Sequence, residues 1–351
     1  MSEIRLEHIT KQFDDFTALS DVSMNIKDGE FFVLLGPTGA GKTTTLRIIA
    51  GLEKQQQGNV YFGGELMNTV PPADRDTAFV FQQYSLYPNM TVYENMAFPL
   101  KSPLRSFSKE EIDRRIKSAA EKLKVTHLLE RKTARLSGGE MQRVSIGRAI
   151  VREPKVFLMD EPLSNLDAKL RESLRVEIKH LQKTQGITTL FVTHDQIEAL
   201  TMADRLAVLD HGKIVQLGTP EDIYDRPATT FVAQLVGTPR INLFGAIRDN
   251  GKLKTKTGNV AFDVPKSLPG DVTVGVRPED IQLQQGGAFK AKVRLTEPLG
   301  VETIVHLQNG DSTLLSIIPG TEQVGVGEEV SFDIAPNRLH FFDGSGSRIQ
   351  V

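Results

Sequence analysis

The chain has 351 residues, 39% of them hydrophobic, which predicts about two domains with buried cores and excludes disorder along the whole chain. With 42 Lys and Arg against 44 Asp and Glu, the net charge of −2 supplies no general attraction for nucleic acid or an anionic lipid surface. The sequence contains no Cys, so disulfides, thiolate nucleophiles and Cys-ligated metals are excluded.

Short apolar runs alternate with helical patterns from Ile4 to about Ala233. Four runs are continuous, as expected for strands buried on both faces of a mainly parallel sheet: Phe31–Leu35, Ala78–Phe81, Val156–Met159 and Thr188–Val192. Between them, Ser108 with Glu111 predicts the start of one helix, and a further helix ends near Gly186. The apolar positions of that helix are Leu166, Leu170, Leu174, Ile178 and Leu181. Strands that alternate with helices predict an α/β layered domain.

The pattern changes towards the C-terminus. Alternating segments such as Val272–Val276 and Glu329–Ile334 are separated by turn signals such as Asn309-Gly310. We therefore predict two domains, residues 1–237 and 238–351, of which the second is all-β and forms a small barrel or sandwich.

No apolar stretch of the sequence approaches the roughly 20 residues that a membrane-spanning helix needs. The N-terminal sequence MSEIRLEHIT carries charges throughout, whereas a signal peptide has an apolar core. We therefore expect any role at a membrane to depend on a partner protein.

A glycine-rich segment directly follows the first continuous run. It reads GPTGAGKT and fits the pattern GxxxxGK followed by S or T between a strand and a helix. Backbone N–H groups of such a loop bind phosphate oxygens, assisted by the N-terminus of the next helix. We expect Lys42 to reach the β- and γ-phosphates of a nucleotide and the Thr43 hydroxyl to hold Mg²⁺. The predicted nucleotide-binding residues of this segment are Gly36, Pro37, Thr38, Gly39, Ala40, Gly41, Lys42, Thr43 and Thr44.

Two acids, Asp160 and Glu161, end the run KVFLMDEP. Carboxylates at the end of a buried strand are costly unless solvent or a cation compensates them. Asp160 suits the Mg²⁺ shell, and Glu161 suits a general base that takes a proton from the attacking water. Two acids after a strand are commonly a solvated strand end, so this interpretation depends on the phosphate loop.

The segment LSGGEMQR, with the phosphate loop and the acid pair, resembles the ATP-binding-cassette (ABC) family of transporter ATPases, whose signature reads LSGGQ. Glu140 stands where Gln is usual. The resemblance covers nearly all of residues 1–235 and implies an α/β P-loop cassette with a helical signature subdomain. In that fold the signature loop lies far from the phosphate loop of its own chain. Ser137, Gly138 and Gly139 are therefore expected to contact ATP across a dimer with a second copy of this or a related cassette.

Four further residues match family motifs. Gln82, in VFQQYSLYP, matches the glutamine that contacts Mg²⁺ and the lytic water and couples the site to membrane subunits. Asp167, in SNLD, matches the D-loop that touches the opposite site of a dimer, and His194, in LFVTHDQIEA, matches the switch histidine at the γ-phosphate. Phe13 stands where an aromatic residue stacks on adenine, with Phe16 as an alternative. Taken alone, each has a structural explanation: a strand end, a helix-start acid, a structural histidine or a core ring.

The C-terminal segments GVRPEDI, EPLG and NRLHFFD resemble the regulatory domain of importer ATPases of the maltose and glycerol-phosphate type, which is built from oligonucleotide/oligosaccharide-binding (OB)-like β modules. The resemblance implies a peripheral ATPase, using ATP and Mg²⁺, at the cytoplasmic face of the bacterial inner membrane. The expected partners are transmembrane permease subunits and, indirectly, an extracytoplasmic solute-binding protein, with no nucleic acid. The region Gln82–Pro99 resembles the surface that receives coupling helices.

The expected solute is a carbohydrate or sugar derivative, with importers of polyamine, iron or sulfate as alternatives. A soluble ABC ATPase of DNA repair or translation is a rival, against which stand the single cassette and the neutral charge. A P-loop kinase or switch GTPase is a second rival, and it would need neither the segment 137–139 nor His194.

Overall fold

The computed structural model describes residues 2–102, 107–249, 252–256, 260–263, 268–320 and 324–350. The chain forms two compact units, Met1–Pro220 and Glu221–Val351. The α-helices are α1 (Lys42–Ala50), α2 (Val92–Ala97), α3 (Lys109–Lys122), α4 (Gly138–Ile150), α5 (Ala168–Gln185), α6 (Gln196–Met202), α7 (Pro220–Asp225) and α8 (Thr230–Leu235). Short 3-10 helices span Pro72–Asp74, Phe98–Leu100, Thr126–Leu128, Thr133–Arg135, Pro278–Asp280 and Pro336–Arg338.

The strands of the first unit are β1 (Ile4–Phe13), β2 (Phe16–Ile26), β3 (Phe31–Leu35), β4 (Gln57–Phe62), β5 (Glu65–Leu66), β6 (Thr77–Val80), β7 (Val156–Asp160), β8 (Thr188–Thr193), β9 (Arg205–Asp210) and β10 (Lys213–Gly218). Those of the second are β11 (Asn242–Asp249), β12 (Lys252–Thr255), β13 (Ala261–Asp263), β14 (Asp271–Val276), β15 (Ile281–Leu283), β16 (Phe289–Pro298), β17 (Glu302–Asn309), β18 (Ser312–Pro319), β19 (Glu329–Ile334), β20 (His340–Phe342) and β21 (Arg348–Ile349).

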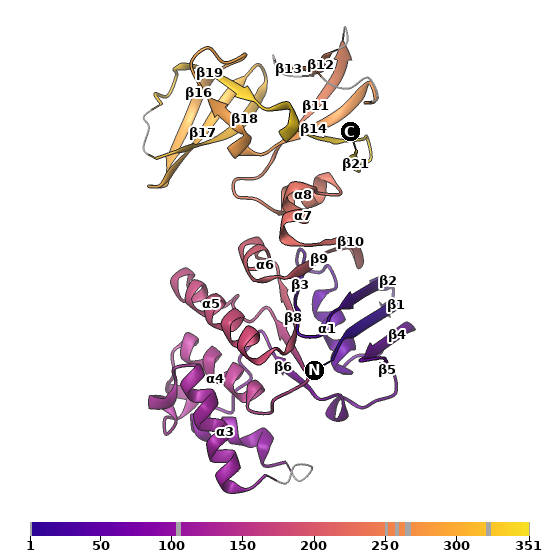
Figure 1. The fold of residues 1–351 in the computed structure, drawn as a ribbon, viewed down its shortest axis with the longest axis vertical. Helices are drawn as coiled ribbons and strands as arrows, with labels where there is room; N and C mark the ends of the chain where they lie inside the picture. The colour runs from indigo at the N-terminus through magenta and orange to yellow at the C-terminus, as the bar shows by residue number, and fades with distance from the viewer. Residues whose placement is uncertain are drawn as a thin grey trace. The chain divides into compact units, whose positions relative to one another are not determined.

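A central sheet with the order β10-β9-β3-β8-β7-β6 organises the first unit (Figure 1). All its pairs are parallel except β9 with β10. Every residue of β3, β7 and β8 is buried, which explains their continuous apolar sequences. The register pairs Leu35 with Thr193 and Asp160 with Val192, so these three strands end together at one edge. That edge is where open α/β sheets bind ligands.

An antiparallel sheet with the order β2-β1-β4-β5 forms a further layer that the sequence analysis did not anticipate. Its inward side chains share a core with α1 and the central sheet, including Leu6, Leu34 and Ile49. The β1–β2 pairing is interrupted by register shifts, and His8 has φ +53°. These irregularities break the two-residue alternation by which a half-buried strand is recognised in a sequence.

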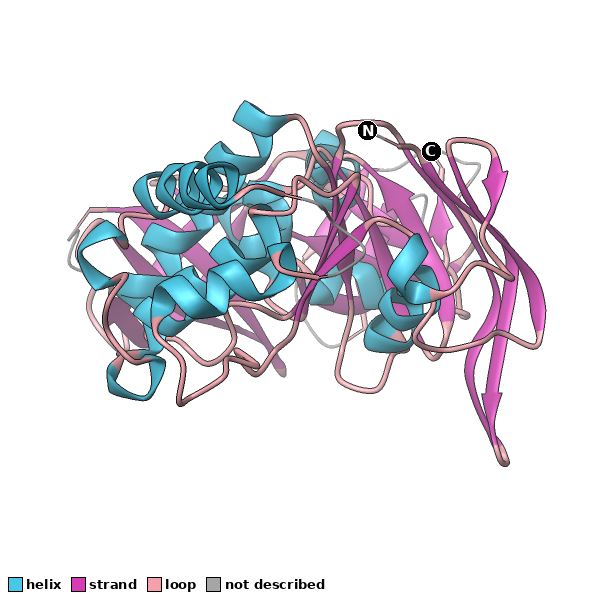
Figure 2. Ribbon diagram, turned by 90° about the horizontal axis from the view of Figure 1, so that it is seen from below, coloured by secondary structure: helices cyan, strands magenta, loops and turns pink. Residues whose placement is uncertain are grey.

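The helical part of the first unit contains α2, α3 and α4, which pack on one another. Figure 1 shows α3, α4 and α5 on one side of the central sheet and β1, β2 and β4 on the other, and the colouring of Figure 2 shows the same grouping of helices and strands. Ser108 caps α3 by accepting the Glu111 N–H, and Gly186 ends α5 at φ +66°, which confirms both predicted helix limits. Leu166 lies just before α5, and Phe81 lies beyond the end of β6, so both predicted elements are shorter at these ends.

The second unit contains two antiparallel sheets, β13-β12-β11-β14-β20-β21 and β15-β19-β16-β17-β18, around one core. Helices α7 and α8 belong to this unit. Arg277, 2% exposed, donates to the carbonyl oxygens of Ala233, Val236 and Tyr224 and so joins both helices to the β-domain. The chain therefore divides at Pro220, earlier than the residue 237 suggested by the change in sequence pattern.

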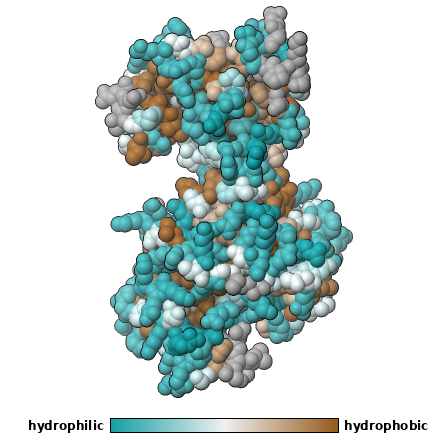
Figure 3. Space-filling model, in the orientation of Figure 1, coloured by the Kyte–Doolittle hydropathy of each residue, from teal (hydrophilic) through white to brown (hydrophobic). Residues whose placement is uncertain are grey.

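Figure 3 shows a surface that is mostly hydrophilic on the visible face, with scattered hydrophobic residues. Among the helices of the described residues, none combines the length and the apolar character needed to cross a membrane.

Candidate functional site

The predicted phosphate loop connects β3 to α1. A Cβ at Gly36 would lie 2.2 Å from the carbonyl oxygen of Leu209, and one at Gly41, where φ is +105°, would lie 2.6 Å from that of Ala18. Gly39 has φ +81°, and no atom lies within 4 Å of its Cβ position. Two glycines thus allow the loop to pack closely on its neighbours, and the third leaves open space beside the backbone.

The Lys42 side chain turns back into this loop. The residue is 5% exposed, and its Nζ donates to the carbonyl oxygens of Gly36 at 2.9 Å and Pro37 at 3.0 Å. Glu161 Oε1 lies 3.3 Å from the same nitrogen. A buried ammonium group held in this way is well suited to a phosphate anion, because charge-assisted contacts are the strong ones.

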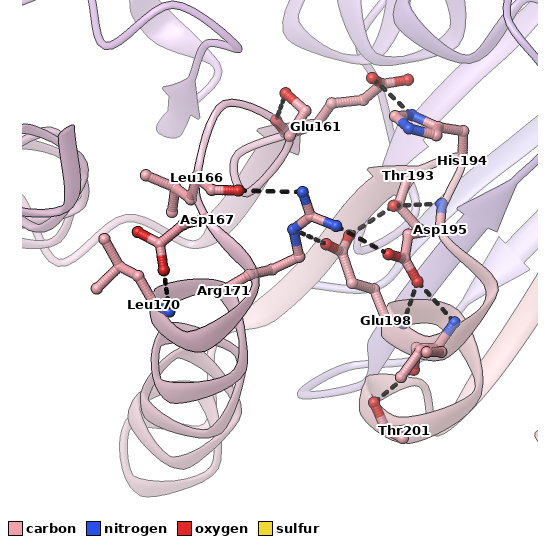
Figure 4. Close-up of polar contacts among 12 residues, drawn as sticks. Glu161, Leu166, Asp167, Leu170, Arg171, Thr193, His194, Asp195, Glu198 and Thr201 are labelled. Atoms are coloured by element: carbon pink, nitrogen blue, oxygen red, sulfur yellow. Dashed lines mark hydrogen bonds and ion pairs between the residues drawn. The ribbon is translucent and has the colours of Figure 1, made fainter. Parts of the chain in front are cut away.

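The adjacent acids Asp160 and Glu161 occupy different environments. Asp160 ends β7, is 8% exposed and accepts a hydrogen bond from the Thr43 hydroxyl at 2.9 Å; burial raises the pKa of its carboxyl group. Glu161 has φ +44°, a strained conformation for a residue with a side chain. Its carboxylate lies beside Lys42 and 3.0 Å from Nδ1 of His194 (Figure 4). The two acids are thus placed for separate tasks.

Thr43 and Asp160 offer neighbouring oxygen atoms of the kind that Mg²⁺ prefers. A bound cation would also offset the cost of burying the carboxylate. Within the described ranges there is no group of three or more His, Asp and Glu side chains that could hold a metal, so phosphates and water would complete the shell. Gln82, the third expected ligand, is exposed, and its Nε2 lies 3.5 Å from Ser164 Oγ.

A cavity of about 440 Å³ lies over the phosphate loop. Its volume falls within the range typical of small-molecule sites, about 300–1,000 Å³. It brings together the predicted catalytic residues Gln82, Glu161 and His194, which follow strands β6, β7 and β8. Its lining consists of Phe13, Phe16, Ala18, Thr38, Gly39, Gly41, Lys42, Thr43, Thr44, Gln82, Glu161 and His194.

The two candidate adenine-stacking residues both line this cavity. Phe13 ends β1 and Phe16 begins β2, and the two pair across a hairpin with a two-residue turn. The Lys11 ammonium lies 4.5 Å from the centroid of the Phe13 ring, which places a cation on that ring. The structure thus brings both rings to the site and leaves the two alternatives open.

The signature segment and Asp167 are helix starts. Ser137 caps α4 in a reciprocal capping box with Glu140, so glutamate serves the fold well where Gln is usual. Gly139 packs on α5: a Cβ there would lie 2.2 Å from Leu170 Cδ2. Asp167 caps α5 by accepting the Leu170 N–H at 3.0 Å. Among the described residues that line the cavity, none comes from segment 137–139, and Asp167 is also absent.

The sequence analysis missed several residues that support this site. The Ser164 hydroxyl donates to the Glu161 carbonyl oxygen at 2.9 Å and so connects the acid pair to the segment that follows it. Arg171 and Glu198 contact the residues on either side of His194, as described below. Ser164 lies within the recognised SNLD segment, so that motif could have identified it. Arg171 and Glu198 lie in α5 and α6, and no local sequence pattern indicates that these helices contact each other.

Comparisons with known proteins agree with this geometry. Residues 19–164 match the ABC transporter family, and residues 274–342 match the TOBE domain. The trehalose/maltose import ATP-binding protein MalK of Thermococcus litoralis is 47% identical over 366 residues, 98% of each chain. The chain belongs to the ABC transporter ATP-binding proteins. The sn-glycerol-3-phosphate import ATP-binding protein UgpC of Rhizobium meliloti is 48% identical over 361 residues, 99% of this chain and 100% of that one.

Solved ABC cassettes share the fold of this ABC protein. A cassette in its ADP conformation matches with a TM-score of 0.59 and 31% identity, over 66% of this chain and 98% of that one. A dimeric bacterial ABC transporter cassette matches with a TM-score of 0.56 and 34% identity, over 62% of this chain and 98% of that one. The predicted P-loop cassette with a C-terminal β-domain is confirmed, and the ABC protein is a nucleotide-binding ATPase.

Proposed function

We propose that this ABC protein is the ATP-hydrolysing subunit of an importer for a carbohydrate or sugar derivative. The observation that carries the proposal is similarity over the full length, including the β-domain, to relatives named for import of trehalose/maltose and sn-glycerol-3-phosphate. The solutes in those names are the ones for which the relatives are named. The same two-unit organisation here supports a solute of the same class.

The phosphate loop holds the nucleotide. Lys42 contacts the β- and γ-phosphates, and residues 36–44 surround them with backbone N–H groups. Thr43, Asp160 and Gln82 would hold Mg²⁺. When bound, the ion would neutralise negative charge on the phosphates. Support comes from the buried Lys42 and from the Thr43–Asp160 contact at 2.9 Å. Phe13, with Phe16 as the alternative, stacks on adenine.

Glu161 acts as the general base for hydrolysis. Its carboxylate accepts a proton from the water that attacks the γ-phosphate, and Gln82 orients that water. An ionised carboxylate only accepts hydrogen bonds, so His194 donates its Nδ1–H to Glu161. The 3.0 Å contact supports a role of His194 in holding both the base and the γ-phosphate.

A second cassette completes the site. Ser137, Gly138 and Gly139 of one copy contact the ATP held by the other, and Asp167 lies at the interface between them. The absence of these residues from the cavity lining among the described residues supports this division. The N-terminus of α4 suits an anion, because its N–H groups point outward from the helix start.

Permease subunits dock beside the Gln82–Pro99 region, at the cytoplasmic face of the cell membrane, and an extracytoplasmic binding protein delivers the solute to them. A cavity of about 260 Å³ lies in this region. Its lining includes Phe81 and Phe98, both exposed, and Tyr87, whose ring lies 4.7 Å from that of Phe98. Arg148 lies 5.7 Å from the Tyr87 ring. Exposed aromatic groups around a hollow suit an inserted apolar helix.

Purification of the membrane complex through a tag on this chain tests the proposal. After reconstitution in liposomes, ATP turnover is measured with trehalose, maltose or sn-glycerol-3-phosphate, and with a polyamine, ferric iron or sulfate. We expect stimulation by a sugar or sugar derivative, and none with the Glu161→Gln protein. Stimulation by polyamine, iron or sulfate alone would contradict the solute class, and failure to recover permease subunits would contradict the importer.

A further inference from the structure

The Arg171 side chain, in the first turn of α5, connects two segments that the proposed mechanism treats separately (Figure 4). Its Nη2 donates to the carbonyl oxygen of Leu166 at 3.1 Å. Its Nη1 donates to Asp195 Oδ2 at 3.4 Å, and its Nε lies 3.9 Å from Glu198 Oε1. One planar guanidinium thus contacts the segment Ser164–Asp167 and the start of α6.

The two carboxylates that face Arg171 hold the residues on both sides of His194. Asp195 follows His194 directly and uses Oδ1 to cap α6, which leaves Oδ2 for Arg171. Glu198, whose side chain is 4% exposed, accepts the hydroxyl hydrogen of Thr193 at 2.5 Å. The Thr193 oxygen in turn accepts the Asp195 N–H at 2.9 Å. The backbone of His194 is therefore fixed by groups that depend on Arg171.

The other contact of Arg171 reaches the segment next to Glu161. Ser164 donates to the Glu161 carbonyl oxygen, and Leu166 accepts from Arg171. Arg171 therefore connects the segment that holds Glu161 to the residues that hold His194. The side chains of Glu161 and His194 themselves meet at 3.0 Å. The buried charge of this network is the carboxylate of Glu198, whose side chain is 4% exposed against 32% for Arg171. A buried carboxylate is costly unless a cation pairs with it, so Arg171 also offsets the burial of Glu198.

We infer that Arg171 is a positioning residue that, with Glu198, fixes His194 against Glu161 and makes that placement depend on the segment Ser164–Asp167. The inference rests on the proposed function, in which this segment lies at the cassette interface. Nε of Arg171 is buried with no hydrogen-bond partner, while Glu198 Oε1 is 3.9 Å away. A movement of about 1 Å would turn this ion pair into a hydrogen bond. The distance between Arg171 Nε and Glu198 Oε1 is thus the one in this network that can shorten when two cassettes meet.

Two variants of the full chain test the inference. Arg171→Lys keeps the charge and loses the planar fork. Glu198→Gln keeps an acceptor for Thr193 and loses the charge, so it tests the same network if the first variant folds poorly. We expect kcat for ATP hydrolysis to fall about 10- to 100-fold in each, because misplacement of a catalytic group by about 1 Å costs this much. KM and the affinity for a fluorescent ATP analogue should change less than about twofold, because neither residue lines the cavity.

Arg175→Lys is the matched control, because Arg175 lies one turn further along α5 and makes no ion pair or side-chain hydrogen bond that the described residues show. It should retain the wild-type kcat. Thermal unfolding of all variants verifies that they are folded at the assay temperature.

Combination with His194→Ala separates positioning from general weakening of the fold. If Arg171 acts through His194, adding Arg171→Lys to His194→Ala lowers kcat by less than about twofold further. If Arg171→Lys lowered kcat by the same factor in the wild-type protein and in the His194→Ala protein, the inference would be overturned. Wild-type kcat in both Arg171→Lys and Glu198→Gln would also overturn it. Either result would leave the proposed function standing. Full activity of His194→Ala by itself would overturn the proposed role of His194 and the inference with it.

Discussion

Replacement of Gly139 by alanine separates two reasons for a glycine in the signature segment. The added Cβ would lie 2.2, 2.9 and 3.0 Å from Cδ2, Cδ1 and Cγ of Leu170. Ordinary carbon contacts are about 3.5–4.0 Å, so Leu170 must move or change rotamer. Overpacking of this kind costs about 1–3 kcal/mol, against a gain in helix propensity of up to about 1 kcal/mol. We expect Gly139→Ala to lower the free energy of unfolding by up to about 2 kcal/mol.

Leu170→Ala removes the obstructing side chain and therefore supplies the test. We expect the double variant to be about 1–2 kcal/mol more stable than the sum of the two single changes predicts, as measured by urea unfolding without nucleotide. Gly138→Ala is the matched control, because the atoms within 4 Å of its Cβ position belong to Tyr84 and Leu166. It should show no coupling to Leu170→Ala.

ATP turnover reports on the second reason for the glycine. If Gly139 also lets nucleotide of the partner cassette approach the backbone, the double variant regains stability without regaining turnover, and this is the expected result. Additive losses of stability, within about 0.5 kcal/mol, would refute the steric reasoning. Recovery of turnover together with stability would show that contact with Leu170 is the whole reason for the glycine.

Three further predictions concern the acid pair, the division into units and the β-domain. Glu161→Gln should bind ATP, turn it over about 10²- to 10⁴-fold more slowly and form an ATP-dependent dimer in size-exclusion chromatography; a monomer with normal turnover contradicts this. A chain ending at Pro220 should bind a fluorescent ATP analogue, whereas one ending at residue 240 keeps α7 and α8 without Arg277 and should be cleaved faster by protease; a folded 1–220 chain that binds no nucleotide would disprove the division. Burial, aided by Arg348, lowers the pKa of His340 to about 4, so the unfolded chain takes up a proton before the folded one. The free energy of unfolding of the second unit should therefore fall by up to about 3 kcal/mol as the pH drops from about 6.5 to 4, and less in His340→Gln; equal pH dependence of the two proteins would refute the assignment.

The sequence predicted those parts of the structure that local patterns determine. The buried strands β3, β7 and β8 were recognisable because both faces are covered and every residue is apolar or a terminal acid or threonine. Ser108 was recognisable as a helix start because its cap uses the neighbouring Glu111, and Asp167 because an acid suits the start of a helix. The phosphate loop was recognisable because its spacing is fixed by its geometry.

Other parts depend on contacts between distant residues. Helices α7 and α8 have six residues each, too few to show a helical period, and they are assigned to the second unit by Arg277, more than 40 positions beyond Ala233 and Val236. The contacts of Arg171 with α6 join residues 24 and 27 positions apart. Such pairings have no signature in a single sequence, so tertiary structure alone reveals them.

The strand end explains how two adjacent acids are placed for the different tasks proposed for them. Asp160 completes the ladder of β7, and its side chain is directed to Thr43. Glu161 still donates its N–H to the Val192 carbonyl oxygen at 3.0 Å, so the sheet holds the backbone although φ is +44°. Such strain costs of the order of 1–3 kcal/mol and persists only where surrounding structure enforces it. Since a backbone bond supplies this support, Glu161→Gln removes the charge and leaves the constraint in place. If the Glu161→Gln protein binds ATP but turns it over slowly, the loss of turnover is therefore due to the missing carboxylate charge. The backbone of the loop is still held in place in that variant.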